Sequence, residues 1–188
     1  MNKVKNFIPL SILRTIYNTL IVPHINYGIL AWGTQCNRLV KLQKKAVRLI
    51  VNAKYNSHTE PIFKQLFLLK IQDIFALQEL KFIFKIKNGM LPHYFLNLQY
   101  FRHSDVHSHN TRFSNYILPL QNQHVFVNKS ICFRVPSILN NCPNIIKEKI
   151  NTHSIKGYSN YIKKYYIEKY SAICLLNHCY SCTNNEIS

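Results

Sequence analysis

Four basic side chains recur at spacings of three and four residues in a helix predicted over residues 39–52: Lys41, Lys44, Lys45 and Arg48. These spacings place the four side chains on one face of an α-helix. No acidic residue lies among them to form the ion pairs that are common on a solvated helix. Such a face is suited to contacting the phosphates of a nucleic-acid backbone, and an ordinary solvated face is the alternative.

The chain as a whole is strongly basic. Its 188 residues include 24 Lys and Arg against 7 Asp and Glu, a formal net charge of +17 that is spread over both halves of the sequence. An excess of this size predicts a polyanionic partner, with nucleic acid as the first candidate and an anionic membrane surface as the second. Three more basic residues are predicted phosphate contacts: Lys81, Lys85 and Arg112.

The sequence predicts no catalytic residues and no cofactor. A two-metal polymerase or nuclease site needs carboxylates that converge on ions about 4 Å apart, whereas Asp73 and Asp105 lie far apart in different surroundings. Asp73 is explained by the first turn of a helix, where negative charge favours the helix dipole. Neither a phosphate-binding glycine-rich loop nor a Gly-x-Ser-x-Gly motif is present.

Two clusters offer weaker metal-binding candidates. The first, near the end of the chain, consists of Cys174, His178, Cys179 and Cys182. The last two cysteines have a zinc-like spacing, but four ligands within nine residues are tight for a tetrahedral site, so free thiols are the main alternative. The second consists of His103, His107 and His109, for which a polar loop or phosphate contact is favoured over a metal.

The predicted fold class is mainly α, with a helical bundle over residues 1–98 and a less regular extension over residues 99–188. Helices are predicted over residues 10–21, 39–52, 60–66, 71–88 and 159–175, with loops and a short hairpin over residues 101–145. Pro23 is expected to end or kink the first helix, Thr59 to cap the third, and Gly89 to end the fourth.

Predicted core positions follow from helical periodicity. In the helix over residues 39–52 the apolar stripe is Leu39, Leu42, Ala46, Leu49 and Ile50. In the helix over residues 71–88 it is Ile74, Leu77, Leu80 and Phe84. Most aromatic residues fit core positions, and three near basic residues are candidates for stacking on bases: Tyr55, Tyr158 and Tyr161.

No segment has the pattern of a signal peptide or a membrane span. The expected location is therefore intracellular, nuclear or cytoplasmic, with the six cysteines reduced.

Several ordered segments together resemble the region that follows the palm in jockey-like non-LTR retrotransposon reverse transcriptases. The first spans residues 13–28 and includes Pro23-His24-Ile25-Asn26-Tyr27-Gly28, with Trp32-Gly33 after it. The second is Leu-Gln-Lys-Lys-Ala-Val-Arg-Leu-Ile at residues 42–50. Later landmarks are found at residues 58–63, 66–73, 88–92, 109–112 and 129–131. The family's Leu-Trp-Asn-x-Leu-Pro landmark reads Ile-Leu-Asn-Asn-Cys-Pro at residues 138–143, without the Trp and the second Leu.

This resemblance, which covers roughly residues 5–170, implies a helical thumb and linker that clamp a template–product duplex. The fingers and palm, with their catalytic aspartates and divalent metals, would precede Met1 and act as partners. The expected function is therefore sequence-independent nucleic-acid binding (DNA, RNA or hybrid), as a fragment of an RNA-directed DNA polymerase. The alternatives are a decayed retrotransposon remnant without function and a co-opted zinc-containing nucleic-acid-binding module.

Overall fold

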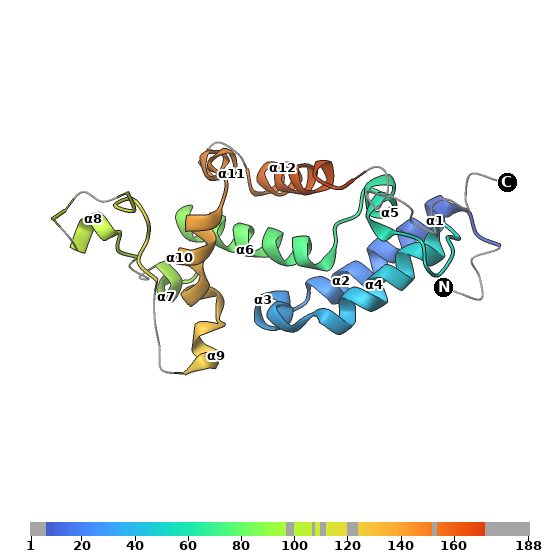
Figure 1. Ribbon diagram of the computed structural model, residues 1–188, viewed down its shortest axis with the longest axis horizontal. Helices are drawn as coiled ribbons and strands as arrows, with labels where there is room; N and C mark the ends of the chain where they lie inside the picture. Colours follow the sequence, from blue (N-terminus) through green and yellow to red (C-terminus); the bar gives the residue numbers. More distant parts are fainter. Residues whose placement is uncertain are drawn as a thin grey trace. The chain divides into compact units, whose positions relative to one another are not determined.

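The structure is a computed structural model that describes residues 7–96, 100–106, 108–109, 112–119, 124–151 and 154–171 (Figure 1). The described residues are mainly helical, which confirms the predicted fold class. Within these ranges no β-strand forms, and an isolated antiparallel bridge joins Arg102 to Ile117. None of the described helices combines the length and apolar character that a membrane crossing requires.

The chain divides into two compact units, each assembled from segments distant in sequence. Unit 1 comprises residues 1–29, 35–75 and 163–188, and unit 2 comprises residues 30–34 and 76–162. The domain boundary predicted between residues 98 and 99, where the helical pattern of the sequence loosens, falls inside unit 2. The two long helices α6 (Ile71–Lys87) and α12 (Ile155–Glu168) each contribute residues to both units.

Unit 1 begins with a helical run that changes register before Pro23. It consists of α1 (Leu10–Ile16), the π-helical segment η1 (Tyr17–Ile21) and α2 (Val22–Asn26). Of the two predicted effects of Pro23, ending or kinking the helix, the first does not occur, because Pro23 falls in the first turn of α2, where its missing N–H needs no helical partner. Two short helical segments follow along the chain, α3 (Ile29–Trp32) and the 3₁₀ turn η2 (Gly33–Gln35), and most of their residues belong to unit 2.

Helix α4 (Asn37–Ile50) is turned relative to its predicted orientation. Its buried residues are Gln43, Val47 and Ile50, whereas Leu42 is 61% exposed. Of the predicted apolar stripe, Ile50 is buried and Ala46 and Leu49 are half-buried. The prediction was wrong for Leu39 and Leu42, which are exposed because the polar residue Gln43 occupies the core instead. The Gln43 amide donates hydrogen bonds to the Tyr17 hydroxyl and the Leu69 carbonyl, each at 2.9 Å, and accepts one from the Ile71 N–H at 2.9 Å.

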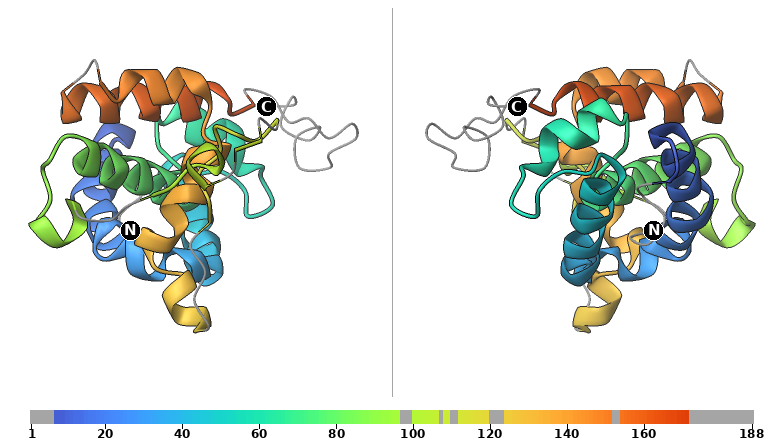
Figure 2. Two further views of the ribbon diagram at one scale, coloured as in Figure 1. Left: turned by 90° about the vertical axis from the view of Figure 1, so that its left-hand side faces the viewer. Right: turned by 90° about the vertical axis from the view of Figure 1, so that its right-hand side faces the viewer.

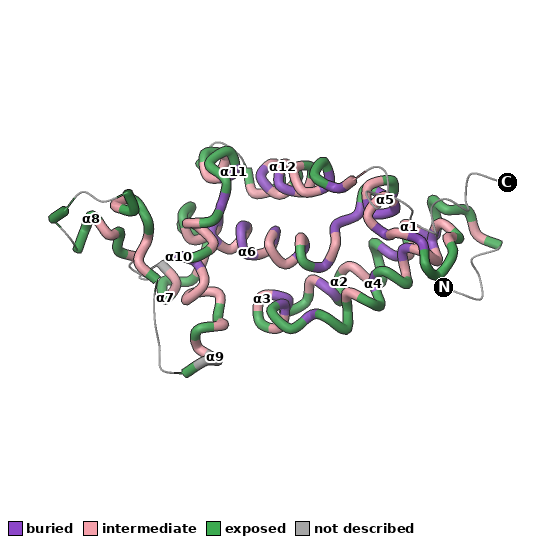
Figure 3. Tube along the Cα trace, in the orientation of Figure 1, coloured by how far each residue is buried: buried purple, intermediate pink, exposed green. Residues whose placement is uncertain are grey.

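Helix α5 (Thr59–Gln65) begins one residue earlier than predicted. His58 is the N-cap, and Thr59 is the first helical residue and makes no capping hydrogen bond, so the predicted Thr59 cap was wrong. The backbone of His58 is extended, so the helix begins directly after this residue. The segment between α5 and α6 is buried over most of its length, as Figure 3 shows, with Leu66, Leu68 and Leu69 in the core.

Helix α6 agrees closely with its prediction. Its core side contains the four predicted residues Ile74, Leu77, Leu80 and Phe84, all buried. At its end the Met90 N–H bonds to the Lys85 carbonyl and the Gly89 N–H to the Ile86 carbonyl, which is the Schellman pattern. Gly89 adopts φ +65°, as this termination requires.

Unit 2 contains helices where loops were predicted. They are α8 (His103–Val106), α9 (Val125–Asn128), α10 (Ile131–Asn141) and the start of α11 (Asn144–Lys149), whereas α7 (His93–Leu96) precedes the range predicted as loops. Pro136 lies inside α10 and removes the N–H that would bond to the Cys132 carbonyl. The Tyr100 hydroxyl donates to that carbonyl instead, at 3.1 Å, so α10 continues through the proline.

Helix α12 starts four residues before its predicted beginning and ends at Glu168. The prediction of helix was therefore wrong for residues 169–171, and the rest of the predicted range, to residue 175, lies outside the described residues. Where it belongs to unit 2, α12 packs over α6 (Figures 1 and 2), and the Tyr158 ring stacks on Phe84 with centroids 5.0 Å apart. Tyr158 is 0% exposed. The prediction that Tyr158 stacks on bases was therefore wrong, because the ring completes the core.

Candidate nucleic-acid interface

Helix α4 presents three exposed lysines, Lys41, Lys44 and Lys45. Within the described residues none of the three forms an ion pair. Between Met1 and Thr59 the sequence contains no acidic residue, so no carboxylate of η1, α2 or α4 offsets this charge. The structure therefore brings together three of the four predicted α4 cations with their ammonium groups accessible to a ligand.

Arg48 is the fourth predicted cation of this face, and it is partly engaged by the protein. Its Nε donates a 2.8 Å hydrogen bond to the Ser57 carbonyl, and its guanidinium carbon lies 6.0 Å from the centroid of the Tyr55 ring. These contacts hold the guanidinium against the loop that follows α4. Tyr55 is 80% exposed, so its ring is accessible to a ligand beside the Arg48 guanidinium.

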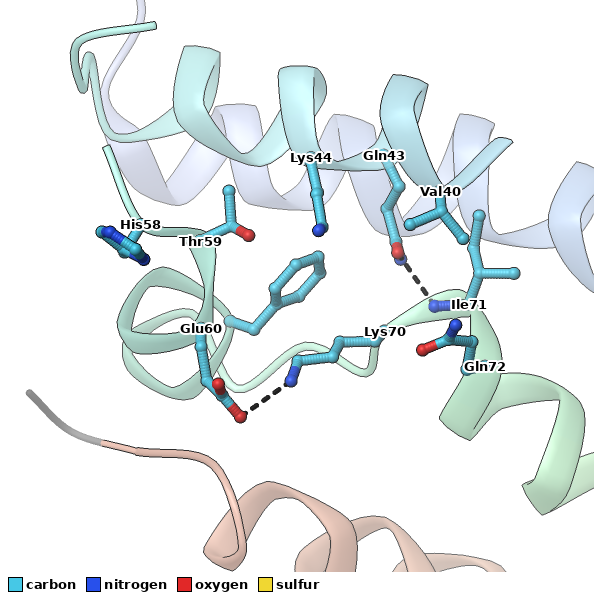
Figure 4. Close-up of a pocket in the computed structure, with 10 residues that line it drawn as sticks. Val40, Gln43, Lys44, His58, Thr59, Glu60, Lys70, Ile71 and Gln72 are labelled. Atoms are coloured by element: carbon cyan, nitrogen blue, oxygen red, sulfur yellow. Dashed lines mark hydrogen bonds and ion pairs between the residues drawn. The ribbon is translucent and has the colours of Figure 1, made fainter. Parts of the chain in front are cut away.

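A cavity of about 250 Å³ opens beside Lys44, between α4, α5 and the start of α6 (Figure 4). Its polar lining consists of Gln43, Lys44, His58, Thr59, Glu60, Lys70 and Gln72. Val40, Phe63 and Ile71 supply the apolar lining. In Figure 4 the Lys44 amino group and the Thr59 hydroxyl both point into the space between α4 and α5.

The charges in this cavity are unequally paired. Lys70 Nζ lies 2.8 Å from Glu60 Oε1 and 4.4 Å from the centroid of the Tyr170 ring, so the Glu60 charge is matched inside unit 1. No such carboxylate partner for Lys44 is found in the described part of the chain. Lys44 therefore gives the cavity a net positive charge.

Asp73, on the first turn of α6, has a partner that sequence reasoning missed. The Tyr170 hydroxyl donates a hydrogen bond to Asp73 Oδ2, and it accepts one from the Lys70 amide at 3.1 Å. Burial raises the pKa of the Asp73 carboxyl, and the Tyr170 hydrogen bond and the charge of Lys70 partly offset the rise. No local pattern in the sequence links Tyr170 to a residue 97 positions away.

The predicted contacts Lys81 and Lys85 lie on α6 in unit 2, and both are half-buried. Burial lowers the pKa of Lys81, and the charge of Lys85 lowers it further. Lys81 borders a hollow of about 310 Å³ together with Lys156, Ser159 and Asn160. Arg112 is exposed in a turn of the same unit.

The metal candidates are only partly covered by the structure. Among the described residues no group of three His, Cys, Asp or Glu side chains could hold a metal ion. His103 is the first residue of α8, and His109 lies in a bend. The remaining candidates, His107, Cys174, His178, Cys179 and Cys182, fall outside the described residues.

The predicted stacking residue Tyr161 is half-buried, and Lys149 Nζ lies 5.9 Å from its ring centroid in unit 2.

Comparison with models of protein families, with curated proteins and with solved structures finds no match to the chain. The candidate interface therefore rests on the residues of the chain itself, a mainly helical protein with an uncompensated lysine face on α4.

Proposed function

We propose that the chain binds nucleic acid through the phosphate backbone, without reading base sequence, and that α4 is the principal contact. The single observation that carries the proposal is the exposed row Lys41, Lys44 and Lys45 on a helix that contains no acidic residue. Lysine contacts to phosphates position a duplex or strand irrespective of its sequence. The formal net charge of +17 supports the same kind of partner.

The proposal extends to the biological setting that the sequence motifs imply. The chain is proposed to correspond to the thumb and linker of a non-LTR retrotransposon reverse transcriptase of the jockey-like kind. Its role there is to hold the template–product duplex, while polymerisation belongs to a palm region outside this chain. The helical fold supports this assignment, because a clamp of this kind needs rigid helices that present cations.

A charge-reversal experiment on the full chain tests the proposal. The variant Lys41→Glu/Lys44→Glu/Lys45→Glu is compared with Lys54→Glu/Lys87→Glu/Lys164→Glu, which changes the net charge equally at exposed lysines elsewhere. Affinity for a duplex of arbitrary sequence is measured at several salt concentrations. Three phosphate contacts on α4 correspond to a contribution of about −2.7 to the log–log salt slope.

The α4 variant is expected to lose most of this contribution, and the control variant is expected to keep it. If both variants weaken binding equally, the charge acts without a defined face and the assignment to α4 fails. Unchanged affinity in both variants contradicts phosphate binding itself.

A further inference from the structure

The cavity beside Lys44 has the composition of a phosphate site. We propose that it seats one phosphoryl group of the bound backbone, held by the Lys44 ammonium, the Thr59 hydroxyl and the His58 imidazole; this inference rests on the proposed function. The three side chains come from α4 and from the chain's entry into α5, so the fold of unit 1 brings them together.

The charge balance of the cavity matches a phosphodiester. Glu60 and Lys70 neutralise each other at 2.8 Å, which leaves Lys44 as the net positive charge. A backbone phosphodiester carries one negative charge at neutral pH.

The polar groups of the cavity are placed to donate hydrogen bonds. Thr59 is buried, yet no hydrogen bond from its hydroxyl to another described residue is found, and the hydroxyl points into the cavity (Figure 4). Lys44 enters from the opposite wall. Together they offer a neutral and a charged donor to the same group, and charge-assisted hydrogen bonds to phosphate are the stronger kind.

The size of the cavity indicates that more than an isolated ion fits. A volume of about 250 Å³ leaves room for sugar atoms on either side of a phosphate. The apolar lining from Val40, Phe63 and Ile71 can contact such carbon atoms. Inorganic phosphate would be recognised by the same side chains as a backbone phosphate, so the experiments must distinguish these two ligands.

The first test uses substitutions with matched partners. Thr59→Val removes the hydroxyl but keeps the shape and charge, and Lys44→Gln is compared with Lys41→Gln on the same helix. We expect Thr59→Val to weaken binding of a single-stranded oligonucleotide about five- to tenfold at fixed salt. We also expect Lys44→Gln to weaken it several times more than Lys41→Gln, because Lys41 does not line the cavity.

The outcomes separate this inference from the proposed function. If Thr59→Val binds like the wild type and Lys44→Gln equals Lys41→Gln, the cavity seats no phosphate and the α4 face alone binds. If the wild-type chain does not bind nucleic acid, both proposals fail. Thermal unfolding of each variant, followed by circular dichroism, verifies that the substitutions leave unit 1 folded.

The second test separates the two sources of phosphate. Amide NMR signals of Thr59 and Lys44 are followed during titration with the oligonucleotide and, separately, with inorganic phosphate. Shifts induced by the oligonucleotide and lost in Thr59→Val support a backbone phosphate in the cavity. Shifts induced by inorganic phosphate alone overturn the assignment to the backbone.

Discussion

The Tyr170 hydroxyl donates a hydrogen bond to the Asp73 carboxylate and so ties the residues after α12 to the first turn of α6 within unit 1. Two further bonds fix the same tyrosine: Lys64 Nζ donates to its carbonyl at 2.7 Å, and the Lys70 amide donates to its hydroxyl at 3.1 Å. Burial, reinforced by the Asp73 carboxylate, raises the pKa of the Tyr170 hydroxyl well above its usual value.

The raised pKa of Tyr170 predicts a loss of stability at alkaline pH. In the unfolded chain the phenol ionises near pH 10, whereas in the folded chain it keeps its proton. The unfolded state therefore binds fewer protons above about pH 10, and the free energy of unfolding falls as the pH rises. Tyr170→Phe is expected to flatten this fall, as measured by urea unfolding between about pH 9 and pH 11. Tyr55→Phe, at an exposed position, is the control and should leave the slope unchanged.

Replacing Gln43 is predicted to be costly although the residue is polar. Gln43→Ala leaves the Ile71 N–H and the Leu69 carbonyl buried without their partner, and each such group costs about 1–3 kcal/mol. The total loss expected in chemical denaturation is about 3 kcal/mol. Gln65→Ala removes an exposed glutamine from α5 and should change the stability by less than about 0.5 kcal/mol. Equal effects of the two variants would contradict a buried amide network.

The orientation of α4 can be tested with two side chains of equal size. Ile50 is 3% exposed and Leu42 is 61% exposed. Ile50→Ala is expected to reduce the free energy of unfolding by about 3 kcal/mol, and Leu42→Ala by less than about 1 kcal/mol. Equal losses would fit the predicted stripe, which contained both residues, and the reverse order would contradict the observed burial.

Helix α10 offers a test of how it accommodates Pro136. Tyr100→Phe removes the donor to the Cys132 carbonyl and is expected to cost about 1 kcal/mol. In a Pro136→Ala background the new N–H can bond to that carbonyl, so the same Tyr100→Phe change should cost much less. A double-mutant cycle in thermal unfolding measures this coupling. Additive effects would show that the hydroxyl does not substitute for the missing helical bond.

Gly89 provides a local test of helix termination. Its φ of +65° is strained for side chains with a Cβ, although an added Cβ would meet no atom within 4 Å. Gly89→Ala is therefore expected to cost about 1 kcal/mol through backbone conformation alone. Gly89→Asn should cost less, because asparagine tolerates the left-handed region better. Equal costs for the two variants would point to a cause other than backbone strain.

Local signals in the sequence predicted part of this fold well. Helix α6 was located by an acidic first turn, a regular apolar stripe and a glycine followed by a proline, all within one segment. The exposed lysines of α4 followed from their spacing in the same way. In each case the information lies within a few turns of the element that it specifies.

The remaining features depend on partners distant in sequence. Helix α10 was missed because Pro136 disfavours a helix, and the compensating Tyr100 lies 32 positions from the Cys132 carbonyl it contacts. The burial of Gln43 was not predicted, because periodicity ranks side chains by hydropathy and cannot anticipate a buried hydrogen-bond network. Tyr158 was wrongly predicted to stack on bases, because the basic residues near it in the sequence suggested a nucleic-acid contact. Its packing against Phe84 is not indicated by any local pattern.

The bonds of Gln43 determine which amino acid can occupy that position. The carboxamide must donate through its nitrogen to Tyr17 and Leu69 and accept through its oxygen from the Ile71 N–H. Glutamate has the same shape but no donor, methionine has neither group, and asparagine is one methylene too short. The site therefore selects a single side chain by hydrogen-bond polarity and reach, which makes position 43 a chemical marker for this packing in any related sequence.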